Sequence, residues 1–536
     1  MRTRWAVVIV AMIGAAVVPR GALAAIEIST DPTSNMICSA GTCTSTAMDA
    51  VLNVNDLQTM LAGSDVAIRT ANGAVTIQIK APLTWASPTR LTLDANLNVS
   101  VKARVAVAGT AAGLTIVTND GGTGGDLIFT DTGSVSFWDV NSSLSINGTA
   151  YTLVKTLDRL AHAVSANPAG AYALAQNYDA RQSNGRIPVQ TELAGQFEGL
   201  GNEIANLVIN IHGKAATCGG LFASGAATSV VRDIRLSNLN MDALAKNWSQ
   251  VGMGGIEGCG EGTIINASVD GTVKCGARKK AHDVGLIAGE AGTILRSQAS
   301  GTVYGVDGRV GGLAGYAANI VSSHANVTII LSHSPSTGGL AGEAGTVSLS
   351  YASGSITPSR VAGGLSAGGL IGRLTGNNPG IDQSYSTVDV RTKGGAIAGG
   401  LAGEGSNITN SYALGSVTVE RSSSAGGLVG EGSKVQSSFA AGLVGNQDPN
   451  GSLGGFIGKD FGGSGSMTDD YWDLDTSGVS NPSRGAGNVK NDDGITGLTD
   501  NALKSELPAG FDPAIWGRKK KINNGYPYLL ANPPPK

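Results

Sequence analysis

Apolar residues recur through the second half of the chain, and their spacing predicts a repeated structural unit. Successive members of this apolar column lie 26 to 35 residues apart. A period of this size is typical of repeat architectures, in which each unit is one supersecondary element. The column consists of Leu221, Ile256, Ile287, Leu313, Leu340, Leu370, Leu401, Leu428 and Phe456.

Each unit offers short β-branched segments rather than a helix. Ile294 and Val347 follow the column position by seven residues, and Val303 and Ile356 follow it by sixteen. Gly-Ser corners separate these positions, and no unit has room for a capped amphipathic helix. Three short strands and three corners per unit predict an all-β fold. Each unit would be one coil of a right-handed parallel β-solenoid, with neighbouring coils about 4.8 Å apart.

The pattern changes on both sides of the repeats. Residues 25–150 alternate apolar and polar positions between Gly, Asn and Asp turns, which predicts a β-rich, β-helical region. Residues 151–192 have the pattern of a helical or irregular insertion, and the repeats occupy residues 193–460. We expect residues 461–536 to form a C-terminal cap and tail, because an uncovered solenoid end is an open sheet edge.

Two segments have helical spacing and predict short capping helices. They are residues 54–63 and residues 156–167, and Thr156 is the expected N-cap of the second. Aromatic residues after the repeats are expected to cover the last coil. These are Trp472, Trp516, Tyr526 and Tyr528.

The composition narrows the possible partners. The 536 residues include 79 glycines, only 14% are charged, and the formal net charge is −3. Such a near-neutral surface gives no reason to expect nucleic acid or an anionic membrane as a partner. The hydrophobic content of 41% argues against disorder.

The first residues have the pattern of a secretory signal peptide. Arg2 and Arg4 precede an apolar run from Trp5 to Val18, and small residues at 22–25 predict cleavage after Ala24. We therefore expect residues 1–24 to be removed and the protein to be secreted or exposed on the cell surface.

Five cysteines would then lie in a compartment that permits disulfides. Cys38 and Cys43 are close enough in sequence to form a local bridge. Cys218, Cys259 and Cys275 leave one thiol over if a second bridge forms, and their spacing does not decide which two are joined.

The repeat core resembles the GLUG motif of bacterial secreted proteins. It reads GLAG at 312–315, 339–342 and 400–403, GLIG at 369–372 and GLVG at 427–430. Residues 148–180 are similar to filamentous-haemagglutinin-like exoproteins. The resemblance implies a surface adhesin, although some peptidase passengers also carry the motif. Export through a secretion partner in the outer membrane is one route that the resemblance leaves open.

Two stretches have partial calcium-binding patterns. GGTGGDLIF (121–129) matches one nonapeptide with Asp126 as a ligand, although that mechanism shares each ion between tandem copies. DLDTSG (473–478) begins like an EF-hand loop with Asp473 and Asp475 as ligands, but Arg484 replaces the bidentate Glu. We expect at most a weak Ca²⁺ site at these residues and otherwise no cofactor. An ordinary turn is the alternative in both places.

Other candidates depend on how the coils stack. The basic loop with Arg278, Lys279 and Lys280 could contact an anionic polysaccharide. Ser366 in GLSAG has the pattern of a hydrolase elbow, but a repeat corner explains it better because no helix follows. A partial acidic stripe would form from Glu290, Glu343, Glu404 and Glu431. A carbohydrate-stacking ladder would form, if the column faces outward, from Tyr351, Tyr385, Tyr412 and Phe439.

These features favour an adhesin-like binding protein that uses repetitive solenoid faces and inserted loops rather than a pocket. The expected partner is a host or environmental surface glycan, glycoprotein or exopolysaccharide. The alternative is a β-helix polysaccharide-degrading enzyme or a peptidase passenger. An enzyme of the first kind needs clustered acids, whereas the acids here are scattered along the sequence. A structural spacer that binds nothing is the third possibility.

Overall fold

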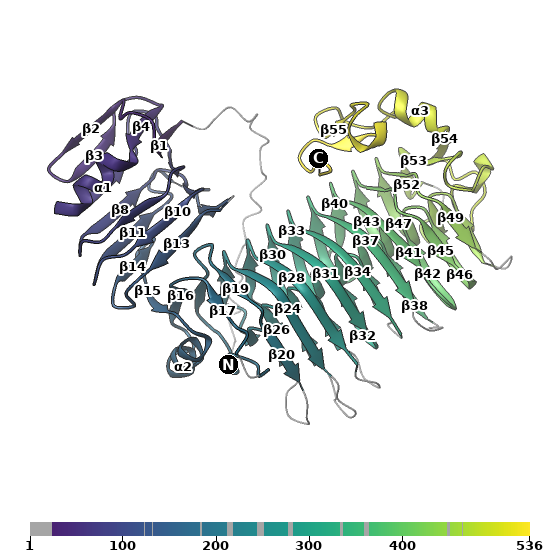
Figure 1. Cartoon of the computed structure of the whole chain (residues 1–536). Helices are drawn as coiled ribbons and strands as arrows, with labels where there is room; N and C mark the ends of the chain where they lie inside the picture. The colour runs from purple at the N-terminus through teal and green to yellow at the C-terminus, as the bar shows by residue number, and fades with distance from the viewer. Residues whose placement is uncertain are drawn as a thin grey trace, which may run out of the picture.

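The chain forms one long solenoid, and the predicted fold class is confirmed. The computed structural model describes residues 24–535 apart from 123, 131, 183–184, 212–217, 244–250, 277–281, 333–335, 359–363, 447–450 and 464. Strands make up 52% and helices 7%, in a β-solenoid of about 16 turns. Figure 1 shows a bend between an N-terminal arm and a longer repeat array. The expected signal peptide lies outside the described residues except for Ala24. Within those residues, no helix has the length and apolarity to cross a membrane.

The N-terminal arm is a short solenoid of parallel strands. One sheet has the order β12 (Leu127–Phe129), β9 (Val99–Val101), β6 (Thr76–Ile79), β1 (Ala25–Ser29) and β4 (Ala50–Asn53). A second sheet has the order β13 (Ser134–Phe137), β10 (Arg104–Val107) and β7 (Leu83–Trp85). The third face has β14 (Ser143–Ile146), β11 (Gly113–Val117), β8 (Arg90–Asp94), β5 (Val66–Arg69) and β3 (Thr42–Ser45). Ile26 and Ile28 of β1 are fully buried on either side of half-exposed Glu27, as the two-residue period of a strand requires.

The predicted local disulfide lies in a hairpin between β2 (Met36–Ser39) and β3. Ala40 and Gly41 make the turn with φ values of 49° and 77°. Two-residue hairpin turns need this left-handed conformation at both positions. The hairpin places Cys38 directly opposite Cys43, with 4.0 Å between their Cα atoms.

Both predicted helices are present. α1 (Val54–Gly63) buries Val54, Leu57 and Leu61. α2 (Leu157–Ala166) begins after Thr156, whose side-chain oxygen accepts a hydrogen bond from the backbone N–H of Arg159. This bond satisfies one of the free N–H groups of the first turn, as expected for an N-cap.

A strand reversal separates the two parts of the solenoid. β14 and β15 (Thr149–Val154) form an antiparallel hairpin, and its turn residues Asn147 and Gly148 have positive φ values of 50° and 80°. β15 then pairs in parallel with β16 (Ala171–Leu174), so one sheet continues from the arm into the array with its strands reversed. The bend in Figure 1 lies at this reversal.

The array stacks its coils through parallel sheets. One has the order β17 (Tyr178–Asp179), β19 (Glu203–Ala205), β24 (Arg235–Ala243), β28 (Ser268–Cys275), β31 (Gln298–Gly305), β34 (His324–Leu331), β37 (Tyr351–Pro358), β41 (Tyr385–Arg391), β44 (Tyr412–Ala413), β48 (Phe439–Ala440), β53 (Asp470–Asp473) and β54 (Ile495–Leu498). We call it the long sheet.

Two further faces complete each coil of the array. The first has β21 (Cys218–Gly219), β25 (Val251–Met253), β29 (His282–Val284), β32 (Gly308–Gly311), β35 (Ser336–Gly338), β38 (Leu365–Gly368), β42 (Gly395–Gly399), β46 (Arg421–Gly426) and β50 (Ser452–Gly454). The second includes β18 (Gln196–Glu198), β23 (Val230–Arg232), β27 (Thr263–Ile265), β30 (Ala288–Leu295), β33 (Ala314–Val321), β36 (Ala341–Ser348), β43 (Ala402–Thr409) and β47 (Val429–Gln436). A second disulfide joins Cys218 to Cys259, the pairing that the spacing left open, and Cys275 is buried outside both bridges.

The apolar column is the core of the array, as predicted. All nine of its members are 0% exposed. The backbone N–H of Leu340 donates to the carbonyl of Leu370 at 2.8 Å, and Leu401 donates to Leu428 at the same distance. The motif glycines allow this close stacking, because a β-carbon at Gly339 would lie 2.2 Å from the carbonyl oxygen of Gly369.

A column of buried serines fixes one corner of each coil. The hydroxyl of Ser323 accepts from the backbone N–H of Ser297 at 3.0 Å, and the hydroxyl of Ser350 accepts from Ser323 at 3.1 Å. The residue before each serine has a positive φ, 49° at Arg296 and 50° at Ser322. The equivalent positions two coils and one coil before Arg296, Asp233 and Asn266, also have positive φ values, and we call all of these left-handed positions the corner column.

The C-terminal segment does not simply close the last coil, which corrects part of the prediction. Trp472 is buried inside the final coil of the array. Trp516 and Tyr526 instead pack on the outside of the long sheet, against Tyr412 and Phe439. In Figure 1 the segment with α3 (Asp500–Ser505) and β55 (Trp516–Gly517) lies along the array.

Candidate functional site: a polar groove at the bend

Two adjoining hollows lie where the arm meets the array. The wide hollow has a volume of about 690 Å³ and the narrow hollow about 390 Å³, and Arg235 and Ser268 line both. The arm contributes Arg104 and Ser134 to the wide hollow and Phe129 to the narrow one. Together the hollows form a groove that exists only because the chain bends.

Two columns of the array supply one wall of the narrow hollow. The corner column contributes Asp233, Asn266, Arg296 and Ser322, with φ values of 56°, 50°, 49° and 50°. The first column of the long sheet contributes Arg235, Ser268, Gln298 and His324, which are paired in register from coil to coil. Because stacked strands are about 4.8 Å apart, each column presents one side chain at that spacing. The repeat therefore produces two regular columns of polar groups.

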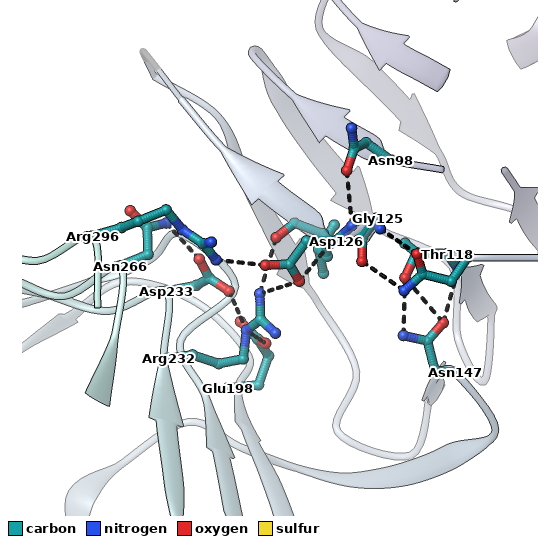
Figure 2. Close-up of polar contacts among 12 residues, drawn as sticks. Asn98, Thr118, Gly125, Asp126, Asn147, Glu198, Arg232, Asp233, Asn266 and Arg296 are labelled. Atoms are coloured by element: carbon teal, nitrogen blue, oxygen red, sulfur yellow. Dashed lines mark hydrogen bonds and ion pairs between the residues drawn. The ribbon is translucent and has the colours of Figure 1, made fainter. Parts of the chain in front are cut away.

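Asp126 joins the arm to the array beside this groove (Figure 2). Arg232 Nη2 lies 2.8 Å from Asp126 Oδ1, and Arg296 Nη2 lies 2.6 Å from Asp126 Oδ2. Arg232 Nη2 also donates to the carbonyl of Leu127 at 3.0 Å, which satisfies a polar group on the edge strand β12. Asn98 Oδ1 accepts from the backbone N–H of Asp126 at 2.8 Å and holds the loop from the arm side.

Two buried carboxyl groups of the array lie next to Arg232 (Figure 2). Its Nε is 2.7 Å from Asp233 Oδ2 and 3.4 Å from Glu198 Oε2, and both acidic side chains are 1% exposed. Burial raises the pKa of Glu198 well above its usual range, and the negative charge of Asp233 adds to the shift. Burial also raises the pKa of Asp233, while Arg232 opposes that shift. The negative charge of Asp233 is thus better compensated by Arg232 than the negative charge of Glu198 is.

The folded chain therefore brings together acids that the sequence interpretation treated as scattered. Asp126, Glu198 and Asp233 surround one guanidinium group. Only Asp233 lines the narrow hollow, and its oxygens already accept hydrogen bonds from Arg232 and Asn266. General acid–base catalysis needs a group that can reach the substrate proton, whereas these contacts hold the carboxylate in the wall.

The geometry argues against the calcium hypothesis at Asp126. Each of its carboxylate oxygens faces a guanidinium nitrogen, so positive charge already occupies the position that a cation would need. Asp126 instead directly precedes strand β12, where its carboxylate pairs with Arg232 and Arg296.

The geometry at Asp473 and Asp475 also favours a turn over a calcium loop. Asp473 Oδ1 accepts from the backbone N–H groups of Asp475 and Thr476 at 2.8 and 3.1 Å, and its Oδ2 accepts from the Tyr526 hydroxyl at 2.8 Å. Asp475 Oδ2 accepts from the backbone N–H of Asp500. These bonds define an Asx turn. Across the described residues, no group of three or more His, Cys, Asp or Glu side chains could hold a metal ion.

The acidic stripe is interrupted by cations. Along one column, Glu343, Arg373 and Glu404 follow each other in register, and Arg373 Nη2 lies 2.7 Å from Glu404 Oε1. Lys459 Nζ lies 2.8 Å from Glu431 Oε1, and Arg309 Nη2 lies 2.6 Å from Glu290 Oε1. Tyr316 separates Glu290 from Glu343, and only Glu404 and Glu431 are direct neighbours, so the stripe is a broken acidic column whose charges are partly paired with Arg and Lys. The basic loop with Arg278, Lys279 and Lys280 lies outside the described residues.

Ser366 lies in a repeat corner. It is 1% exposed, and its hydroxyl donates to the carbonyl of Gly372 at 2.7 Å. Ser336 makes the same bond to Gly342 one coil earlier, so the hydroxyl has a structural role that repeats along the array.

The aromatic column faces outward, which the sequence left undecided. His324, Tyr351, Tyr385, Tyr412 and Phe439 stack with centroids 4.7 to 5.1 Å apart and nearly parallel planes. Each inner ring has both faces covered by its neighbours. Trp516 also covers the edges of Tyr412 and Phe439. A sugar cannot stack on the faces of the inner rings, so the ladder does not work in the way we expected.

Sequence reasoning missed the groove because the residues that line it have no common motif. Asp233 and Asn266 carried a weak signal, since Asp and Asn are enriched at left-handed positions. Their partner Asp126 is 106 residues from Arg232, and no periodicity links the two.

Comparison of the sequence with models of known protein families and with curated proteins gave no match. The resemblance to GLUG-motif and filamentous-haemagglutinin-like proteins therefore stays a hypothesis.

Proposed function

We propose that this protein is an adhesin-like binding protein whose groove at the bend holds an extended, hydroxyl-rich polymer. The polymer would be a polysaccharide or the glycan of a surface glycoprotein. The observation that carries the proposal is the pair of adjoining hollows, lined from successive coils by guanidinium, amide and hydroxyl groups. Planar polar side chains of this kind form directional hydrogen bonds with sugar hydroxyls.

The size and openness of the groove suit a chain rather than a small enclosed ligand. Each hollow has a volume within the range usual for ligand sites, and their shared residues make them continuous. The regular spacing of the wall also suits a repeating ligand, because modest contacts multiply when one chain spans several of them.

Export and disulfide formation are consistent with a surface role. The signal-peptide pattern at residues 1–24 and the two disulfides support a secreted or cell-surface protein. The GLUG-like cores support the same proposal by resemblance, and a secretion partner in the outer membrane would be one route to the surface.

One observation favours an enzyme as the second candidate. Asp126, Glu198 and Asp233 cluster beside the groove, and glycoside hydrolysis uses paired carboxyl groups. Their burial and their bonds to Arg232 support a positioning role instead.

The test is a glycan-array screen of the purified chain, followed by measurement of affinity for the saccharides that bind. Arg235→Ala should weaken binding, because Arg235 lines both hollows. Arg391→Ala is the matched control, since Arg391 is exposed on the long sheet and does not line either hollow. Equal affinities for the two variants would refute the groove. Cleavage of a bound saccharide that disappears in Asp233→Asn, with an unchanged melting temperature, would make the protein an enzyme, because Asp233 is the acid of the cluster that lines the narrow hollow.

A further inference from the structure

The aromatic stack ends at the narrow hollow. Tyr351 covers one face of the His324 ring, with the centroids 4.7 Å apart and the planes within 4° of parallel. On the other side of His324 the same column continues as Gln298 and Ser268, which have no rings. One face of the terminal ring is therefore left without an aromatic neighbour.

His324 lines the narrow hollow at the end that lies farthest along the array. The other array residues that line the hollow belong to the coil of His324 or to coils nearer the bend, whereas Tyr351 does not line it. Phe129 lines the same hollow from the arm. The hollow thus has aromatic groups from both parts of the chain, and planar polar groups between them.

We propose that the face of His324 opposite Tyr351 is a stacking subsite for a pyranose ring of the bound polymer. This inference rests on the proposed function and names the chemical group that the narrow hollow recognises. A pyranose has an apolar face of C–H groups and a rim of hydroxyls. An aromatic ring covers such a face well, and the hydroxyls then need polar partners around it.

The wall provides those partners. Gln298 Nε2 donates to Ser268 Oγ at 3.2 Å, and Asn266 Nδ2 donates to Asp233 Oδ1. Both amide groups therefore use their nitrogen within the wall, and their oxygens can accept from sugar hydroxyls. Arg235 adds donors on the same side, because only part of its guanidinium is used in the bond to the Gly201 carbonyl.

The charge state of the ring is compatible with stacking. Burial lowers the pKa of His324 below its usual value, which favours the neutral imidazole. A neutral ring loses less hydration than an imidazolium when a sugar covers it.

The experiment measures the affinity of the full chain for cellohexaose, xylohexaose, hexagalacturonate and a mucin glycoprotein at pH 7.5. His324→Ala should weaken binding about five- to tenfold, as expected for loss of one aromatic contact. His324→Tyr should retain binding within about twofold, because it restores a ring at the end of the stack. His162→Ala is the matched control, since His162 is exposed on α2 far from the column in sequence. Thermal melting of each variant shows whether the fold is intact.

The outcomes separate the subsite from the groove. Weaker binding by His324→Ala with rescue by His324→Tyr would support the subsite, and the probe that binds would identify a neutral polymer, an acidic polymer or a glycoprotein as the source of the sugar. If Arg235→Ala reduces affinity and His324→Ala does not, the groove binds the polymer without this subsite. If the intact chain binds none of the four probes, the subsite is refuted; if the glycan array is also negative, so is the proposed function.

Discussion

Asp126 of the N-terminal arm and Arg232 of the repeat array are 106 positions apart in sequence, yet their side chains meet at 2.8 Å. This ion pair lies at the bend and forms part of the boundary between two solenoid segments whose strands run in opposite directions. It also anchors the wall of the groove, because Arg232 holds Asp233 in place.

Removal of Arg232 should destabilise the protein strongly. Arg232→Ala would leave Glu198 and Asp233, both 1% exposed, without their cation. Breaking a buried pair in this way typically costs about 3–5 kcal/mol. Chemical denaturation should show this loss. The control is Arg69→Ala, whose pair with Asp94 involves a 58% exposed arginine and should cost about 1 kcal/mol or less. Similar losses for both variants would mean that the bend does not depend on the network.

The buried Glu257 should make the stability depend on pH. Burial raises its pKa from 4.5 to about 8, against a backbone hydrogen bond from Gly225. The folded protein thus holds this proton more tightly than the unfolded chain. The contribution of Glu257 to stability is fully present below about pH 4.5 and is lost as the pH rises to about 8. Over this range the free energy of unfolding should fall by about 1.4 kcal/mol per pH unit.

Glu257→Gln tests this dependence. The variant should lose less stability than the parent between pH 5 and pH 8, as measured by the free energy of unfolding in denaturant. Glu261→Gln provides the comparison, because Glu261 is exposed four residues away. A parent protein whose stability does not fall over this pH range would contradict the assignment.

Loss of the hydroxyl should change stability in opposite directions at two tyrosines, Tyr412 of the long sheet and Tyr526 of the C-terminal segment that packs on it. The hydroxyl of Tyr412 is buried and has no partner among the described residues, so Tyr412→Phe should leave stability unchanged or raise it. The hydroxyl of Tyr526 donates to Asp473 at 2.8 Å, so Tyr526→Phe should lower stability by about 1–3 kcal/mol. Thermal melting of the two variants distinguishes them. A larger loss for Tyr412→Phe would show that its hydroxyl does have a partner.

The apolar column should tolerate no charge. Leu401 is 0% exposed between neighbouring coils, and Leu401→Asp would bury an unpaired carboxylate there. We expect a loss above about 4 kcal/mol and disruption of several units, because repeats stabilise their neighbours. Thr387→Asp, on an exposed position of β41, should have little effect. A Leu401→Asp protein that melts like the parent would contradict the solenoid core.

Much of this protein is determined by local sequence. Contacts within one coil or between adjacent coils determine which positions of the repeat are apolar and which are glycine, and these contacts recur with the sequence period. The N-cap role of Thr156 depends on its own helix. The helix at 54–63, the helix after Thr156 and the Cys38–Cys43 bridge could therefore be predicted, since each depends on residues close together in the chain.

The functional features depend on contacts that do not repeat. The hairpin at Asn147 reverses the strands once, and only after that reversal does Asp126 reach Arg232 and Arg296. The cover over Tyr412 likewise follows from where a distant segment packs. A contact made once leaves no period in the sequence. The sequence by itself determined the solenoid and its core, whereas only the tertiary structure decided where the solenoid bends, what the bend encloses and which aromatic rings the C-terminal segment covers.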